Sequence, residues 1–149
     1  MNIKESITID RSREIVWEHI HDPRYMVKWN PRIRKLIPNE ENLPGIGYRF
    51  SVLYEILGKP ENFAGEIIVY KKSSQLGIKY LDNGKRYKGY ILEGFELADT
   101  KNGTKLTHWF DFRYSGINII TRTGITLLGF LGRPIGKKYL FTLKSSIES

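Results

Sequence analysis

The C-terminal third of the chain decides the predicted fold. Residues 104–114 read TKLTHWFDFRY, where apolar or aromatic side chains alternate with mostly polar ones, as in a strand with one buried face. Residues 127–147 read LLGFLGRPIGKKYLFTLKSSI, where apolar residues recur at steps of three or four, as on one face of a helix. These two patterns predict an α+β fold in which a sheet wraps around one long C-terminal helix and leaves a hollow.

The residues before this region predict a first strand, two short helices and an antiparallel meander. A two-residue period runs from Ile3 to Ile9, and Ser12 then caps a helical stripe that Asp22-Pro23 stops. A second short helical turn covers 25–29. Glycine, asparagine and proline turns separate the remaining predicted strands, which are 48–56, 63–70, 76–81, 87–97 and 104–114.

The length of 149 residues predicts a single domain spanning 1–149. The chain has no cysteine, which excludes disulfides, thiolate zinc sites and cysteine nucleophiles and fits a reducing compartment. The N-terminal residues lack the pattern of a signal peptide, and no apolar run reaches the roughly 18 residues of a membrane span. We therefore expect a cytoplasmic protein.

The net charge of +8 is concentrated in two segments. Residues 11–37 hold seven Lys or Arg against three acids, and residues 120–149 hold five against one. Both segments are predicted to be helical, so the simplest interpretation is solvated helix faces. The alternative is a basic surface that meets anionic lipid or an acidic partner. For weak docking on an anionic membrane, the candidate residues are Arg133, Lys137, Lys138 and Lys144. Nucleic acid is not expected, because no helix-turn-helix, zinc-finger or RNA-recognition signature accompanies the charge.

Several short segments in a fixed order resemble one known superfamily. They are Ser12-Arg13-Glu14-Ile15-Val16-Trp17, Tyr25 with Trp29-Asn30-Pro31, Gly45-Ile46-Gly47, Asn102-Gly103-Thr104-Lys105-Leu106-Thr107, and Leu143-Lys144 with Glu148. With the order of elements, they resemble the START-like superfamily, also called SRPBCC, and within it the polyketide cyclase/dehydrase and lipid-transport group. The resemblance implies a helix-grip fold, in which a curved seven-stranded sheet closes on the long helix around an elongated cavity. It implies no catalytic motif.

The strand alternation and the helical stripe predict which residues line this cavity. Aromatic side chains with polar tips suit a pocket that orients a flat or long apolar ligand, and glycines on the helix leave space where side chains would fill it. The alternative is that the same side chains fill a solid core. The predicted lining is Tyr48, Phe50, Val52, Tyr54, Ile56, Tyr87, Ile91, Glu93, Phe95, His108, Phe110, Phe112, Tyr114, Gly129, Gly132, Gly136 and Leu140.

His108 and Glu93 are the histidine and the acid among the residues predicted to point into the cavity. Glu93 is expected to pair with His108, or with Arg86 or Lys88 if the strand register shifts by one. His108 is a catalytic candidate only, because an inward histidine is more often a hydrogen-bonded lining residue. His19 and His21 lie on different faces of one helix, so the histidines predict no metal site.

Three functions are compatible with these patterns. The first is a non-enzymatic protein that binds a lipid, quinone or polyketide-like molecule for transport or sequestration, with no cofactor. The second is a cyclase or dehydratase in which His108 takes a proton and Tyr54 or Tyr114 donates to the developing enolate. The third is an adaptor or chaperone co-factor that binds a protein through the basic helices.

Overall fold

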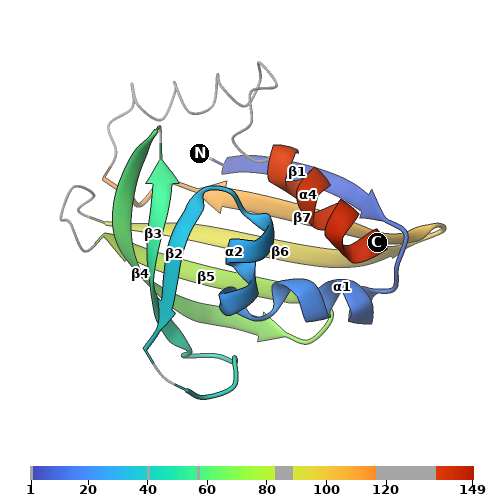
Figure 1. Ribbon diagram of the computed structural model, residues 1–149, viewed down its shortest axis with the longest axis horizontal. Coiled ribbons are helices and arrows are strands. Elements are labelled where there is room, and N and C mark those ends of the chain that lie inside the picture. The colour runs from blue at the N-terminus through green and yellow to red at the C-terminus, as the bar shows by residue number, and fades with distance from the viewer. Residues whose placement is uncertain (1, 40, 57, 83–88, 117–136) are drawn as a thin grey trace.

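The structure is a computed structural model that describes residues 2–39, 41–56, 58–82, 89–116 and 137–149 (Figure 1). Its strands form one antiparallel sheet in the order β1-β7-β6-β5-β4-β3-β2. Apart from the crossing that places β1 beside β7, each strand pairs with its neighbour in sequence. The strands are β1 (Asn2–Ile9), β2 (Ile33–Pro38), β3 (Arg49–Ile56), β4 (Lys59–Lys71), β5 (Gln75–Asp82), β6 (Tyr90–Thr100) and β7 (Gly103–Asp111).

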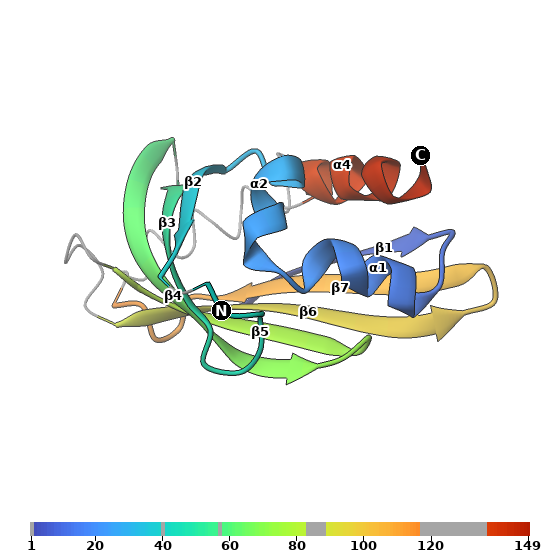
Figure 2. The same ribbon diagram turned by 60° about the horizontal axis from the view of Figure 1, so that its bottom comes forward.

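The helices lie together on one face of this curved sheet, as Figure 2 shows. Their buried side chains are apolar and join the same core as the inward residues of the strands. This arrangement confirms the predicted α+β helix-grip fold. The helices are α1 (Arg13–Ile20), the short 3-10 helix η1 (Pro23–Tyr25), α2 (Met26–Trp29) and α4 (Lys137–Glu148).

Local sequence signals explain the ends of the first helices. The Ser12 side chain accepts a hydrogen bond from the Ile15 backbone N–H at the start of α1. The Asp22 carboxylate accepts from the Arg24 backbone N–H at the start of η1, where Pro23 occupies a position that needs no donor. These caps turn the chain so that Val16 and Ile20 are buried against the sheet.

The strand β2 was not predicted from the sequence. Ile33 is buried, but Arg34 and Lys35 are both exposed, and the pairing with β3 shifts register between Ile33 and Lys35. The irregularity removes the two-residue period by which strands are recognised. The basic side chains suit an edge strand, where charge discourages pairing with another chain.

Part of the predicted C-terminal helix lies outside the described residues. In the described α4, Leu143 and Ile147 of the predicted helical stripe are buried, and so is Leu140, which the prediction placed on the adjoining glycine side. Gly129, Gly132 and Gly136 lie outside the described residues. Among the helices that are described, none is long and apolar enough to span a membrane.

Candidate functional site

The concave face of the sheet, which the helices cover, carries the aromatic residues predicted to point inward. Because side chains directly opposite in an antiparallel pair point to the same face, the register assigns Phe95 and His108, and also Glu93 and Phe110, to this face. The predicted lining residues that are buried are Tyr48, Phe50, Val52, Tyr54, Ile91, Glu93, Phe95, His108, Phe110, Phe112 and Leu140. Tyr87 and the side chain of Ile56 lie outside the described part of the chain.

A buried hydrogen-bonded triad joins three neighbouring strands at this face. The Tyr80 hydroxyl of β5 donates to Oε1 of Glu93 at 2.7 Å. On the other side, Nε2 of His108 from β7 lies 2.8 Å from Oε2 of Glu93, a contact in which the ring N–H donates and the carboxylate oxygen accepts. Glu93 is 0% exposed and His108 is 2% exposed. Glu93 therefore contacts His108, the first of the partners considered for it, whereas Arg86 and Lys88 lie outside the described residues.

Aromatic rings enclose the triad. The His108 ring centre lies 4.6 Å from that of Phe95 and 4.8 Å from that of Phe110. Tyr80 contacts the edges or faces of Phe50 and Phe63 at the same ring separation, 6.1 Å in each case. The apolar surroundings lower the local dielectric, so the hydrogen bonds of the triad are electrostatically stronger than the same bonds in water.

A second buried polar pair lies beside the triad. The Asn30 side-chain amide donates to the Tyr54 hydroxyl at 2.9 Å, and its carbonyl oxygen accepts from the Arg32 backbone N–H. Burial, and next the negative charge of Glu93, raise the pKa of Tyr54 well above its ordinary value of 10. Tyr54 therefore keeps its hydroxyl proton throughout the physiological range, so the hydroxyl that accepts from Asn30 can also donate a hydrogen bond.

Sequence reasoning missed Tyr80 and Asn30 as site residues. Tyr80 follows Leu76 and Ile78 at steps of two residues. The alternation that identified His108 therefore also predicts that Tyr80 points inward. Asn30 had no comparable signal, since it lies at the C-terminal cap of α2 and reaches the site only through the tertiary fold. Sequence position alone does not show which helix cap faces the sheet.

The expected inward orientation of Tyr114 is wrong. The alternation continues past the end of β7, but the Asp111 carboxylate accepts from the Arg113 backbone N–H and turns the chain there. Tyr114 is 49% exposed, and its ring stacks on Tyr90 at 5.2 Å. It is therefore not part of the concave face.

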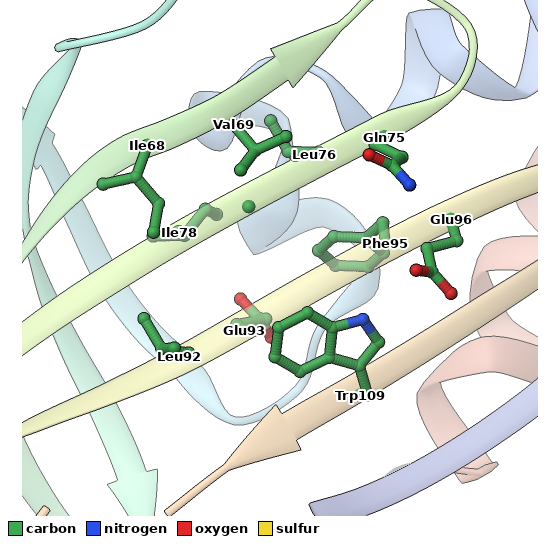
Figure 3. A pocket seen from close by; sticks show the side chains of 11 residues that line it. Ile68, Val69, Gln75, Leu76, Ile78, Leu92, Glu93, Phe95, Glu96 and Trp109 are labelled. Carbon is green, nitrogen blue, oxygen red and sulfur yellow. The ribbon is translucent and has the colours of Figure 1, made fainter. Parts of the chain in front are cut away.

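A small depression lies on the opposite, convex face of the sheet (Figure 3). Gly77 and Gly94 face each other across β5 and β6, and the Trp109 side chain lies over Gly94. The depression has a volume of about 100 Å³. Pockets for small organic ligands have volumes of roughly 300–1,000 Å³, so this one is too small for the predicted ligand. The predicted cavity between the sheet and the C-terminal helix stays a prediction, because the glycine-bearing segment of that helix lies outside the described residues.

The other histidines make local contacts. Nδ1 of His19 lies 2.9 Å from the Ile15 carbonyl oxygen, and Nδ1 of His21 lies 3.0 Å from the Tyr70 hydroxyl. Within the described ranges, no three His, Asp or Glu side chains come together in a way that would hold a metal ion.

Comparison with known proteins places the chain by its fold. No protein-family model and no curated protein sequence matches it. The protein TTHA0849 from Thermus thermophilus superposes with a TM-score of 0.75 at 12% identity, over 99% of this chain and 97% of that one. For major latex-like protein 151 from Panax ginseng the TM-score is 0.68 at 17% identity, over 99% and 95% of the two chains.

A third similar structure is DynU16, a protein from the dynemicin biosynthetic locus. It superposes with a TM-score of 0.65 at 17% identity, over 99% of this chain and 47% of DynU16. Identities this low establish the fold alone. The chain shares the fold of these proteins, with the curved seven-stranded sheet and C-terminal helix of the helix-grip fold that its sequence led us to expect.

Proposed function

We propose that this protein binds one apolar small molecule of lipid, quinone or polyketide-like character at the concave face of the sheet, as a carrier or sequestering protein. The observation that carries the proposal is the Tyr80–Glu93–His108 triad, which lies buried among aromatic rings. An apolar surface with a few convergent polar groups is the usual composition of a small-molecule site.

Energetics support a functional role for the triad. Burying a carboxylate costs several kcal/mol of desolvation, and well-packed apolar residues in place of a buried ion pair are often neutral or stabilising. A core that served only to fold this domain would not need Glu93 at 0% exposure. Orienting one end of a ligand explains why a buried polar triad is present, whereas the stability of the fold does not.

The ligand class rests on the shape and chemistry of this face. Flat aromatic side chains favour contact with rings or long alkyl chains. DynU16, which shares the fold, comes from a biosynthetic locus, and this is compatible with a polyketide-like ligand. The fold hosts many functions, so the argument depends on the residues of the site and not on the likeness. A cytoplasmic location stays a prediction from the cysteine-free composition.

Tryptophan fluorescence tests both the binding and its location. Trp29 packs its ring edge against Phe95 on the concave side, at 5.9 Å, whereas Trp109 lies over Gly94 on the convex side. A bromine atom quenches tryptophan at contact, so ω-bromoundecanol, an uncharged alcohol with bromine at its far end, reports which tryptophan it meets. We expect saturable quenching in the wild type and in Trp109→Phe, and weaker quenching in Trp29→Phe. Quenching that is lost in Trp109→Phe instead, or that never saturates, would contradict the proposal.

The hydrogen bond between Glu93 and His108 also favours a second candidate function, proton transfer in a cyclase or dehydratase. A carboxylate that holds Nε2–H leaves the other ring nitrogen of the histidine as the basic one. Tyr54 stands as the candidate donor to an enolate, and Tyr114 is withdrawn from that role. His108→Ala separates the two functions: a carrier changes its affinity by about 1 kcal/mol, the worth of one hydrogen bond, whereas an enzyme loses turnover by orders of magnitude.

A further inference from the structure

We infer that Tyr54 is a specificity-determining residue, whose hydroxyl donates a hydrogen bond to a carbonyl-type oxygen of the ligand. The inference rests on the proposed function, since it concerns which apolar molecule the concave face accepts. Within that class, it favours ketones, quinones and esters over molecules of the same shape that lack an acceptor oxygen. It follows from the direction of one buried hydrogen bond.

The hydrogen bonds of Asn30 fix the orientation of its side-chain amide. Oδ1 of Asn30 lies 3.0 Å from the Arg32 backbone nitrogen. Because a backbone N–H can only donate, its partner must be the oxygen of the amide and not the nitrogen. The amide nitrogen of Asn30 is therefore the atom that meets the Tyr54 hydroxyl, at 2.9 Å.

This orientation leaves the hydroxyl proton of Tyr54 uncommitted. The amide nitrogen of Asn30 donates to the tyrosine oxygen and cannot accept a hydrogen bond in return. Burial raises the pKa of Tyr54 well above its ordinary value, so the proton stays on the oxygen at neutral pH. The O–H bond of Tyr54 must therefore point away from Asn30.

The described part of the chain offers this proton no acceptor. Among the residues that the structure describes, the hydrogen bond from Asn30 is the one that reaches the Tyr54 hydroxyl. Glu93 acts on Tyr54 through its charge, while its two oxygens accept from Tyr80 and His108. Tyr54 is 5% exposed and Asn30 is 1% exposed. A buried donor without an acceptor costs free energy, and buried polar groups in native proteins nearly always have a partner.

The surroundings of the hydroxyl indicate the chemistry of that partner. The Tyr54 ring lies edge to face with the rings of Tyr80 and Phe110, at 6.2 Å between centres in each case. An apolar molecule held against these rings supplies the acceptor if it carries a carbonyl oxygen. A carbonyl group accepts and donates nothing, so it brings no donor that would itself need a partner among apolar side chains. A plain alkyl chain would leave the Tyr54 donor unsatisfied.

The test compares two probes that share their chain length and a terminal bromine, namely an ω-bromo methyl ketone and the corresponding bromoalkane. Tryptophan quenching gives the dissociation constant of each probe for the wild type and for Tyr54→Phe, which keeps the ring and loses the hydroxyl. The ketone should bind Tyr54→Phe roughly three- to tenfold more weakly than the wild type, the effect of one net hydrogen bond. The bromoalkane should bind both proteins equally.

The infrared spectrum of the bound ketone gives an independent measurement. A hydrogen bond to a carbonyl oxygen lowers its stretching frequency, so the carbonyl band should lie at lower wavenumber in the wild type than in Tyr54→Phe. Loss of a merely structural hydrogen bond would not move this band.

Asn30 is the positioning residue for this contact, and Asn30→Asp tests its role. The variant keeps the shape of the side chain but replaces the amide donor with an acceptor, so the Tyr54 proton should turn toward it. Ketone affinity and carbonyl band should then resemble those of Tyr54→Phe, although the hydroxyl is still present. An Asn30→Asp protein that matches the wild type in both measurements would overturn the positioning role.

Tyr114→Phe is the matched control, because it removes a tyrosine hydroxyl from an exposed residue outside the concave face. It should leave both affinities and the carbonyl band unchanged. A Tyr54→Phe variant that binds the ketone as the wild type does, or loses no more affinity than Tyr114→Phe, would overturn the inference and leave the proposed function intact. So would a carbonyl band that does not move. If neither probe quenches saturably in the wild type, the proposed function fails and the inference fails with it.

Discussion

The Glu93 carboxylate has a donor on each side, and the two donors come from different strands. Tyr80 reaches the carboxylate from β5 and His108 reaches it from β7. The triad therefore links three central strands of the sheet through side chains as well as through the backbone. Removing one partner leaves a buried charged or polar group whose hydrogen bonding is incomplete, and this costs more than removing both.

His108→Leu should therefore lower the free energy of unfolding by about 3 kcal/mol, the cost typical of breaking a buried pair from one side. The double variant His108→Leu with Glu93→Leu should be more stable than the single variant, because no buried carboxylate is left without its histidine. Urea denaturation of the double variant and of the two single variants, His108→Leu and Glu93→Leu, measures these free energies of unfolding. A double variant whose loss equals the sum of the losses of the two single variants would show that the pair is not coupled.

The central pair of this site could be predicted from the sequence, but its full composition could not. Strand alternation placed His108 and Glu93 on one face because each strand has a period of two. Tyr114 has the same phase in the sequence, but its predicted inward orientation was wrong, because the Asp111 turn ends the strand before it. Asn30 depends on how a helix end meets the sheet, which no local period encodes.

At the scale of elements, the C-terminal end of α4 is fastened to β1 by polar contacts. The Glu148 carboxylate accepts from the Asp10 backbone N–H and from the Lys144 ammonium, both at 2.8 Å. Lys144 also donates to the Thr8 carbonyl oxygen, and Arg11 donates to the Glu148 carbonyl oxygen. The last turn of the helix is thereby held over the end of the strand.

These contacts predict a dependence of stability on pH. The Asp10 N–H first, and then Lys144, hold the pKa of Glu148 below its ordinary value of 4.5. A lowered folded-state pKa means that the stabilisation is present above pH 4.5 and is lost as the pH falls through the folded-state pKa. Glu148→Gln should therefore reduce stability at pH 7 and flatten the loss of stability in acid. Parallel stability–pH curves for variant and wild type, measured by urea denaturation, would contradict this assignment.

Close packing of strands β6 and β7 on the convex side depends on a glycine. A Cβ atom added at Gly94 would fall 2.2 Å from the ring of Trp109, whereas one added at Gly45 would meet no atom within 4 Å. Gly94→Ala should lower the free energy of unfolding by about 1–3 kcal/mol, the cost of overpacking. Gly45→Ala should stay within about 0.5 kcal/mol of the wild type. Equal midpoints of thermal unfolding for the two variants would show that Trp109 moves aside at no cost.

The elements themselves were predictable to different degrees. The period of two located β3 to β7, and the Ser12 cap located α1, because in each case the local pattern and the tertiary role agree. The edge strand β2 was not predicted, because Arg34 and Lys35 are adjacent and both exposed and so break the two-residue period. Their exposure is a consequence of the irregular pairing of β2 with β3.

At the scale of the whole molecule, the positive surface raises the question of where a ligand is acquired. Contact with an anionic membrane surface remains a proposal that rests on Arg133, Lys137, Lys138 and Lys144. Lys144 is already engaged with Glu148, so its contribution should be smaller than the roughly 1 kcal/mol that each cation near such a surface provides.

Sedimentation with vesicles measures that contact. More protein should sediment with phosphatidylserine-containing vesicles than with phosphatidylcholine vesicles at low salt, and the difference should vanish as salt rises, since surface attraction is screened. If the protein ignores both kinds of vesicle at low salt, the basic segments are only solvated surface.

The most direct measurement of the central claim is native mass spectrometry of the purified protein. A protein that holds one apolar molecule against the Tyr80–Glu93–His108 triad should show a second mass, larger than that of the chain by the mass of one small apolar compound. Added ω-bromoundecanol should displace that compound and leave a complex of one probe per chain. A spectrum with the bare chain alone, which accepts no probe at saturating concentration, would contradict the account.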